Sequence, residues 1–173
     1  GFSSFHNIKT ASEFFVGYLM FDVLISNQDR HNENWGMIIT SKGVTHLAPS
    51  YDHGASLARN ESDKTRQIRL ESRDQGQQVP NYVRKAKSQF QDSSTNKRLK
   101  LIEAFRRYAL MEKVAALAWL DRLNQIEDTQ IWIIIDKVPS LLMSNISKQF
   151  TFQLLICNRD NLLKMYNEFR EDV

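Results

Sequence analysis

The sequence has little of what disulfide-rich, membrane and turn-rich β proteins depend on. It contains one cysteine, Cys157, so no disulfide can form within the chain. Six glycines and three prolines in 173 residues are few for a sandwich of many short strands. No apolar run approaches the roughly 20 residues of a membrane-spanning helix, and no stretch has the pattern of a signal peptide. We therefore expect a globular, cytoplasmic protein without membrane attachment.

Basic residues are concentrated in the middle of the chain. The formal net charge is only +3, but residues 59–107 hold 13 Lys/Arg against 6 Asp/Glu. Such a region can attract phosphate, nucleic acid or an acidic protein. Aromatic residues are not interleaved with these basic residues, as a nucleic-acid-binding surface would require. We therefore expect a solvated surface and no direct nucleic-acid binding.

The first part of the chain predicts one buried helix and one β-hairpin. Thr10 and Glu13 have the spacing of a capping box, which opens a helix that continues to about Ile25. Apolar residues lie on nearly every side of this helix, as in a helix that is surrounded by protein. Residues 35–47 form two β-rich runs separated by a short turn that ends at Gly43, which predicts a hairpin.

The remainder predicts a long loop followed by helices. Residues from about 58 to 94 are polar and without periodicity, so we expect an irregular loop with at most a short helix near residues 82–90. From residue 95 onward, apolar spacing predicts four or five helices with a break near residues 109–111. Asn158 has the residue type that caps a final helix. The expected fold class is therefore mainly α with a small β-hairpin.

Two carboxylates and a carboxamide occupy the polar loops around the predicted hairpin. Asp29 precedes Asn34 by five residues, and Asp52 follows the hairpin. Protein kinases place a catalytic Asp five residues before a metal-binding Asn and bring a second metal-binding Asp from a later segment. Asp22 and Asn27 have the same spacing, but Asp22 lies within the apolar helix and Asn27 is only its polar end. Asp29 and Asn34 are therefore the better candidates.

The sequences of these loops resemble those of a known family. The run DRHNEN resembles the catalytic loop of phosphatidylinositol-kinase-like enzymes. The larger frame, NQDRHNENWG followed by LAPSYDHG, resembles the HipA-like Ser/Thr kinases of bacteria still better, with their Asn-x-Asp-x-His-x-x-Asn loop and Leu-x-Pro-x-Tyr-Asp second site. Residues 14–57 carry the resemblance best, and the helices after Leu99 resemble the helical lobe of that family.

The resemblance implies a role for each matching residue. Asp29 would orient the hydroxyl of a protein substrate, and Asn34 and Asp52 would bind Mg²⁺ on the phosphates of ATP. His31 would contact the transferring phosphate or order the loop, and Asn27 and Gln28, next to Asp29, would be structural. If the kinase is the toxin of a toxin–antitoxin pair, an antitoxin would be a further partner.

The nucleotide-binding half of a kinase has no counterpart in the sequence. There is no G-x-G-x-x-G loop and no Val-Ala-x-Lys strand, and only 28 residues precede Asp29. We therefore expect residues 1–173 to form one C-terminal lobe, with its catalytic segment at 26–57, an activation-type loop at about 58–94 and a helical part at 95–173. The N-terminal lobe would belong to the same gene product or to a separate chain.

Three other functions remain open from the residues alone. The first is a metal-dependent phosphohydrolase or nuclease, whose candidate ligands would be Asp29, His31, His46, Asp52 and His53. The second is a docking lobe without catalytic activity, for which the missing phosphate-binding loop is the argument. The third is a lipid kinase, because the run DRHNEN is shared with lipid kinases.

Overall fold

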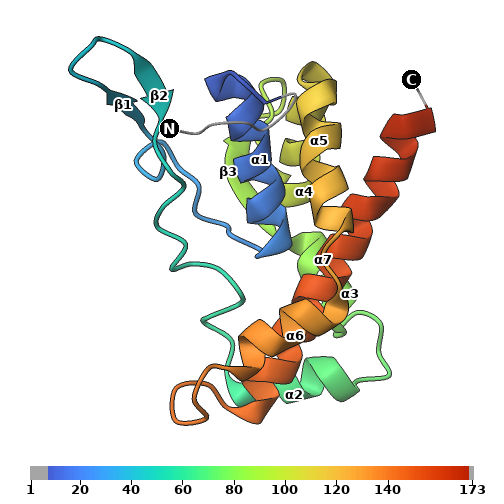
Figure 1. The fold of residues 1–173 in the computed structure, drawn as a ribbon. Helices are drawn as coiled ribbons and strands as arrows, with labels where there is room; N and C mark the ends of the chain where they lie inside the picture. The colour runs from blue at the N-terminus through green and yellow to red at the C-terminus, as the bar shows by residue number, and fades with distance from the viewer. Residues whose placement is uncertain (1–7, 172–173) are drawn as a thin grey trace.

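The computed structural model describes residues 8–171, and its elements are mainly helical with two small antiparallel hairpins (Figure 1). The expected fold class is confirmed, with one hairpin more than predicted. In chain order the elements are α1 (Ala11–Leu24), β1 (Met37–Ile39), β2 (Thr45–Leu47), α2 (Asp63–Glu71), α3 (Val79–Lys85), β3 (Lys87–Gln91), β4 (Arg98–Lys100), α4 (Leu101–Met111), α5 (Lys113–Asn124), α6 (Asp128–Asp136) and α7 (Asn145–Glu171).

Helix α1 runs through the main core, as its apolar sequence predicts. Its start is the predicted capping box: the Thr10 hydroxyl accepts a hydrogen bond from the Glu13 amide, and the Glu13 carboxylate accepts one from the Thr10 amide. The helix packs against α4, α5 and α7. Buried side chains from all four helices form this core; among them are Val16, Leu19, Val23, Phe105, Leu120 and Leu162.

Helix α7 is continuous where two helices were predicted. It runs for 27 residues, and Asn158 lies buried within it instead of capping a new helix. The Asn158 amide donates to the Leu24 carbonyl at 3.0 Å and to the Ser26 hydroxyl at 2.8 Å. A tertiary partner therefore satisfies this side chain, which the local pattern could not reveal. The neighbouring Cys157 is half-buried, and burial raises the pKa of its thiol.

The predicted hairpin is formed by β1 and β2, which pair from Met37 with Leu47 to Ile39 with Thr45. Gly43 in the turn has a φ of +74°, which few other residues adopt at low cost. Only Leu47 of the six strand residues is buried, so the hairpin projects from the helices (Figure 1). The Tyr18 hydroxyl attaches its end to α1 by donating to the Ala48 carbonyl at 2.5 Å.

The segment from 58 to 94 is more ordered than the predicted irregular loop. It contains α2, α3 and β3, and the predicted helical part begins at Leu101 instead of residue 95. Helix α2 has no fully buried residue, although its Leu70 packs against a small apolar cluster that includes Val83 and Leu154. Polar contacts also hold the helix: Arg66 donates to the Ser147 hydroxyl at 2.5 Å and to the Ala58 carbonyl at 3.2 Å.

The second hairpin, β3–β4, was not predicted because its strands are polar. Lys87 pairs with Lys100, and Gln91 pairs with Arg98. The strand β3 has no alternation of apolar and polar residues, and Ser88 is its one buried residue, so the sequence carried no strand signal.

In the helical part of the chain the prediction agrees better with the structure: the predicted break separates α4 from α5 at Glu112. Within residues 8–171, no helix has both the length and the apolar character that crossing a membrane requires.

Replacing Gly17 with alanine is expected to destabilise the fold. An added Cβ would lie 2.4 Å from the Trp119 ring, whose indole nitrogen donates to the Glu13 carbonyl at 2.9 Å. Overpacking of this kind costs about 1–3 kcal/mol, which outweighs the gain of about 1 kcal/mol in helix propensity. Urea denaturation of the Gly17→Ala variant, the Trp119→Phe variant and the double variant measures the free energy of unfolding of each. The double variant should lose less stability than the two single losses together; strict additivity would contradict the contact.

Candidate active site

The loop that contains Asp29 starts from a fixed point at the end of α1. Ser26 adopts a φ of +52°, which turns the chain out of the helix, and its hydroxyl accepts the hydrogen bond from Asn158 on α7. The next amide, that of Asn27, donates to the Asp22 carbonyl at 2.8 Å. Ser26 and Asn27 are both buried. The first residues of the loop are therefore held by two helices before Asp29 is reached.

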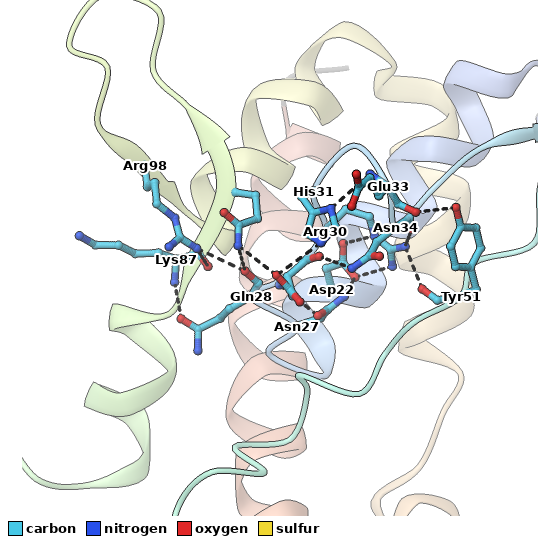
Figure 2. A network of polar contacts seen from close by, with 12 residues as sticks. Asp22, Asn27, Gln28, Arg30, His31, Glu33, Asn34, Tyr51, Lys87 and Arg98 are labelled. Atoms are coloured by element: carbon cyan, nitrogen blue, oxygen red, sulfur yellow. Dashed lines mark hydrogen bonds and ion pairs between the residues drawn. The ribbon is translucent and has the colours of Figure 1, made fainter.

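A buried ion pair lies directly beneath this loop (Figure 2). Arg30 is 1% exposed, and its Nε and Nη2 donate to the two carboxylate oxygens of Asp22 at 2.8 and 2.7 Å. The side-chain amide of Asn27 also donates to the Asp22 carboxylate, at 2.8 Å. Burying charges is costly unless they are paired and hydrogen-bonded, and the two-pronged geometry meets that condition. The pair therefore fixes the loop to α1.

The same guanidinium holds the segment that follows the hairpin. Its Nη1 donates to the Asn34 carbonyl at 2.6 Å and to the Tyr51 carbonyl at 3.4 Å, and its Nη2 donates to the Ser50 hydroxyl at 2.9 Å. With the two bonds to Asp22, all five N–H donors of Arg30 have acceptors. The Tyr51 hydroxyl adds a direct link by donating to the Glu33 carbonyl at 2.8 Å. Helix α1, the Asp29 loop and the Tyr51 segment therefore meet at one side chain.

Asp29 lies at the accessible edge of this network. Its side chain is 43% exposed, and its amide donates to the Asn27 side-chain oxygen at 3.2 Å. One carboxylate oxygen accepts a hydrogen bond from the Gln89 side chain on β3 at 3.2 Å and lies 3.9 Å from His31 Nε2. His31 Nδ1 accepts a hydrogen bond from the Glu33 amide at 3.2 Å. The carboxylate is therefore oriented by neighbours yet open to a substrate.

Asn34 and Asp52 lie on the two segments that Arg30 joins. The side-chain nitrogen of Asn34 donates to the Asp29 carbonyl at 2.7 Å, and its side-chain oxygen has no hydrogen bond within residues 8–171. Asp52 is exposed and has a φ of +53°, a strained conformation for a residue other than glycine. Oxygen atoms of a carboxamide and a carboxylate are ligands that suit Mg²⁺. The chemistry of the two side chains therefore fits this cation.

The histidines of the alternative hydrolase site do not converge. His53 packs edge-on against Phe21, with ring centroids 5.1 Å apart, and its Nε2 lies 3.2 Å from the Ser50 hydroxyl. His46 sits on the exposed hairpin, opposite Ile38. Across the described part of the chain, no three His, Cys, Asp or Glu side chains gather in a geometry that could hold a metal ion. The arrangement therefore gives no support to a transition-metal hydrolase.

Three residues of the site were missed or set aside in the sequence. Asp22 did carry a signal, because it is the one acidic residue of α1 after the first turn, and a buried acid must find a partner. Arg30 had no pattern that distinguished it from the other basic residues. Gln89 is 60 residues from Asp29, and only the fold brings the two together.

Comparisons with known proteins show what the chain is similar to in sequence and in fold. Residues 2–128 match the family described as the HipA-like C-terminal domain, which includes the Asp29 loop and both hairpins. The crystal structure of the Helicobacter pylori proinflammatory kinase CtkA is similar, with a TM-score of 0.73 and 25% sequence identity. That similarity covers 92% of this chain but 54% of CtkA, so the chain spans about half the length of that kinase. No curated protein matches the chain.

Removing the charge of Asp22 is expected to destabilise the chain strongly. Asn at this position keeps the shape but leaves the Arg30 guanidinium buried without a counter-charge. Breaking a buried pair in this way costs about 3–5 kcal/mol. Chemical denaturation of Asp22→Asn should show this loss. The same change at Asp160, an exposed residue of α7, is the matched control and should stay within about 0.5 kcal/mol of the parent; equal stability of the two variants would refute the assignment.

Proposed function

This chain belongs to the family of HipA-like C-terminal domains, and we propose that it is the catalytic lobe of a Ser/Thr protein kinase. In this proposal the γ-phosphoryl group of ATP passes to a hydroxyl of a protein substrate. The observation that carries the proposal is the Arg30 network, which holds the loop of Asp29 and Asn34 against the segment that leads to Asp52. Phosphoryl transfer depends mainly on such positioning and on charge stabilisation.

Asp29 is the residue to orient the attacking hydroxyl. Its carboxylate is accessible, and Gln89 and Asn27 hold the residue in place. His31 would act beside it on the phosphoryl group. Because its Nδ1 accepts a hydrogen bond from the Glu33 amide, a neutral His31 carries its proton on Nε2, the nitrogen nearer Asp29. That N–H would be available to a phosphate oxygen.

Asn34 and Asp52 are the residues to hold Mg²⁺. The side-chain oxygen of Asn34 and the Asp52 carboxylate would each contribute a ligand, and the phosphates of ATP and water would complete the shell. The bound cation would neutralise charge that develops on the phosphates. The strained backbone of Asp52 supports a functional role, because such conformations cluster at active sites.

A second lobe would complete the nucleotide site. The chain spans about half of CtkA, and the projecting β1–β2 hairpin exposes apolar side chains: Met37 is 59% and Ile39 is 73% exposed. An apolar surface of this kind suits a protein partner. In this proposal the partner is the N-terminal lobe, supplied by the same gene product or by another chain. If the kinase acts as a toxin, an antitoxin would be a second partner.

The isolated chain is expected to bind ATP weakly. It would contribute metal ligands and no phosphate-binding loop, so most contacts to the nucleotide would be missing. Isothermal titration with ATP and Mg²⁺ should give a dissociation constant of about 1 mM or weaker. An affinity like that of an intact kinase would contradict the proposed division of the nucleotide site.

Removing the carboxylate of Asp29 is expected to reduce transfer from labelled ATP by about 10²–10⁴-fold in the full-length gene product. Asparagine at this position keeps the shape of the side chain but cannot accept the hydroxyl proton. The assay compares Asp29→Asn with the parent and with Asp160→Asn, which alters an exposed residue far along α7. Equal transfer by the Asp29 variant and the parent would remove Asp29 from the reaction.

A further inference from the structure

The β3–β4 hairpin lies directly against the loop of Asp29. The Lys87 amide donates to the Gln28 side-chain oxygen at 3.1 Å, and the Arg98 guanidinium donates to the Gln28 carbonyl at 3.3 Å. Gln89, on the same hairpin, donates to the Asp29 carboxylate at 3.2 Å. Figure 2 shows Lys87 and Arg98 on one side of this loop and Tyr51 on the other.

The two sides of Asp29 therefore suit different reactants. In the proposed function Asp52 binds Mg²⁺, so the side of Tyr51, the residue before Asp52, would hold the metal and the nucleotide phosphates. In phosphoryl transfer the attacking and leaving oxygens lie roughly in line, so the acceptor approaches from the opposite side of the phosphoryl group. The β3–β4 hairpin occupies that opposite side, where the polypeptide that carries the acceptor hydroxyl would lie.

This acceptor side is strongly basic. Residues 84–100 contain six basic side chains and one acidic residue, Asp92. Asp92 is already engaged: hydrogen bonds from Ser94 and from Arg107, its ion-pair partner at 2.6 Å, hold the pKa of the carboxyl well below its usual range. Of the ion pairs formed within residues 8–171, none involves a basic residue of 84–100. The basic charge on this face is therefore not neutralised by neighbouring carboxylates.

A small cavity opens on the same side. It has a volume of about 270 Å³, and Gln28, the residue before Asp29, is part of its wall. Lys85 and Arg69 also line it. Arg69 is paired with Glu61 at 3.2 Å, whereas Lys85 has no carboxylate partner within the described residues. The cavity thus offers an unpaired ammonium group next to the loop that carries Asp29.

We propose that this face, headed by Lys85 and Lys87, binds an anionic side chain of the protein substrate close to the acceptor serine or threonine. The anion would be the carboxylate of Asp or Glu, or the phosphate of a residue already phosphorylated. An extended chain advances roughly 3.3–3.6 Å per residue, so a residue a few positions from the acceptor would reach the cavity. Nucleic acid is the less favoured ligand, because Phe90, the one aromatic residue on β3–β4, packs against Phe15 instead of offering a stacking face.

This inference rests on the proposed kinase function, and its test uses the full-length gene product with ATP. Peptides share one acceptor serine and differ only in the flanking residue, which is glutamate, phosphoserine, alanine or lysine. We expect kcat/KM to be about two- to fivefold higher for the glutamate or phosphoserine peptide than for the alanine peptide, and to lose this advantage at high salt. A preference for phosphoserine alone would assign the anion to a phosphorylated residue. Equal rates for all four peptides would overturn the inference.

Charge-reversal variants test whether Lys85 and Lys87 cause the preference for anionic peptides. The Lys85→Glu and Lys87→Glu variants should lower the ratio of the glutamate to the alanine peptide to about one or below and should favour the lysine peptide. Lys164→Glu changes the same charge on an exposed residue of α7 and should keep the parent ratio. An unchanged ratio in the Lys85 and Lys87 variants would overturn the site.

Binding separates failure of this inference from failure of the kinase proposal. Fluorescence polarisation with labelled glutamate and alanine peptides needs no catalysis. Tighter binding of the glutamate peptide that Lys85→Glu abolishes would support the anion site even if no phosphate is transferred, in which case only the kinase proposal fails. Transfer without any anion preference would overturn the site and leave the kinase standing. Binding of single-stranded RNA in place of the peptide, sensitive to the same variants, would also overturn it.

Discussion

The guanidinium of Arg30, buried among five acceptors, is the contact on which the site depends. Two of its hydrogen bonds go to Asp22 in α1, one to the loop at Asn34 and two to the segment at Ser50 and Tyr51. The loop and the segment are polar, so hydrogen bonds and not apolar packing must hold them, and Arg30 makes five of these bonds. An arginine can join them because its planar fork presents five donors in fixed directions.

Two further contacts extend this order to the rest of the fold. Asn158 links the end of α1 to the middle of α7 by hydrogen bonds, and Gln89 links β3 to the Asp29 carboxylate. The Asn158 bonds satisfy polar groups that are buried, whereas the Gln89 bond orients a carboxylate that is open to solvent. The positive φ values of Ser26 and Asp52 persist at the two ends of this network, where neighbouring contacts hold the backbone.

The candidate site has different surfaces on its two sides. On one side the projecting β1–β2 hairpin exposes apolar residues, which in the proposed function would face the N-terminal lobe. On the other side the β3–β4 hairpin and the end of α3 present unpaired cations. Asp29 lies between the two faces. Membership in the HipA-like family explains the loop itself, whereas the charge of the acceptor side is a property of this chain's own residues.

Local physics explains what could be predicted from the sequence alone. The capping box at Thr10, the turn glycine at Gly43 and the apolar spacing of the helices act within a few residues, so α1, the first hairpin and the α4–α5 break were predictable. Asp29, Asn34 and Asp52 were singled out by their spacing and by the resemblance to HipA-like kinases, and their roles stay predictions. The tertiary structure alone decided the rest. Asn158 finds its partners 132 and 134 residues away and Gln89 finds Asp29 across 60, and no local pattern encodes contacts at such separations.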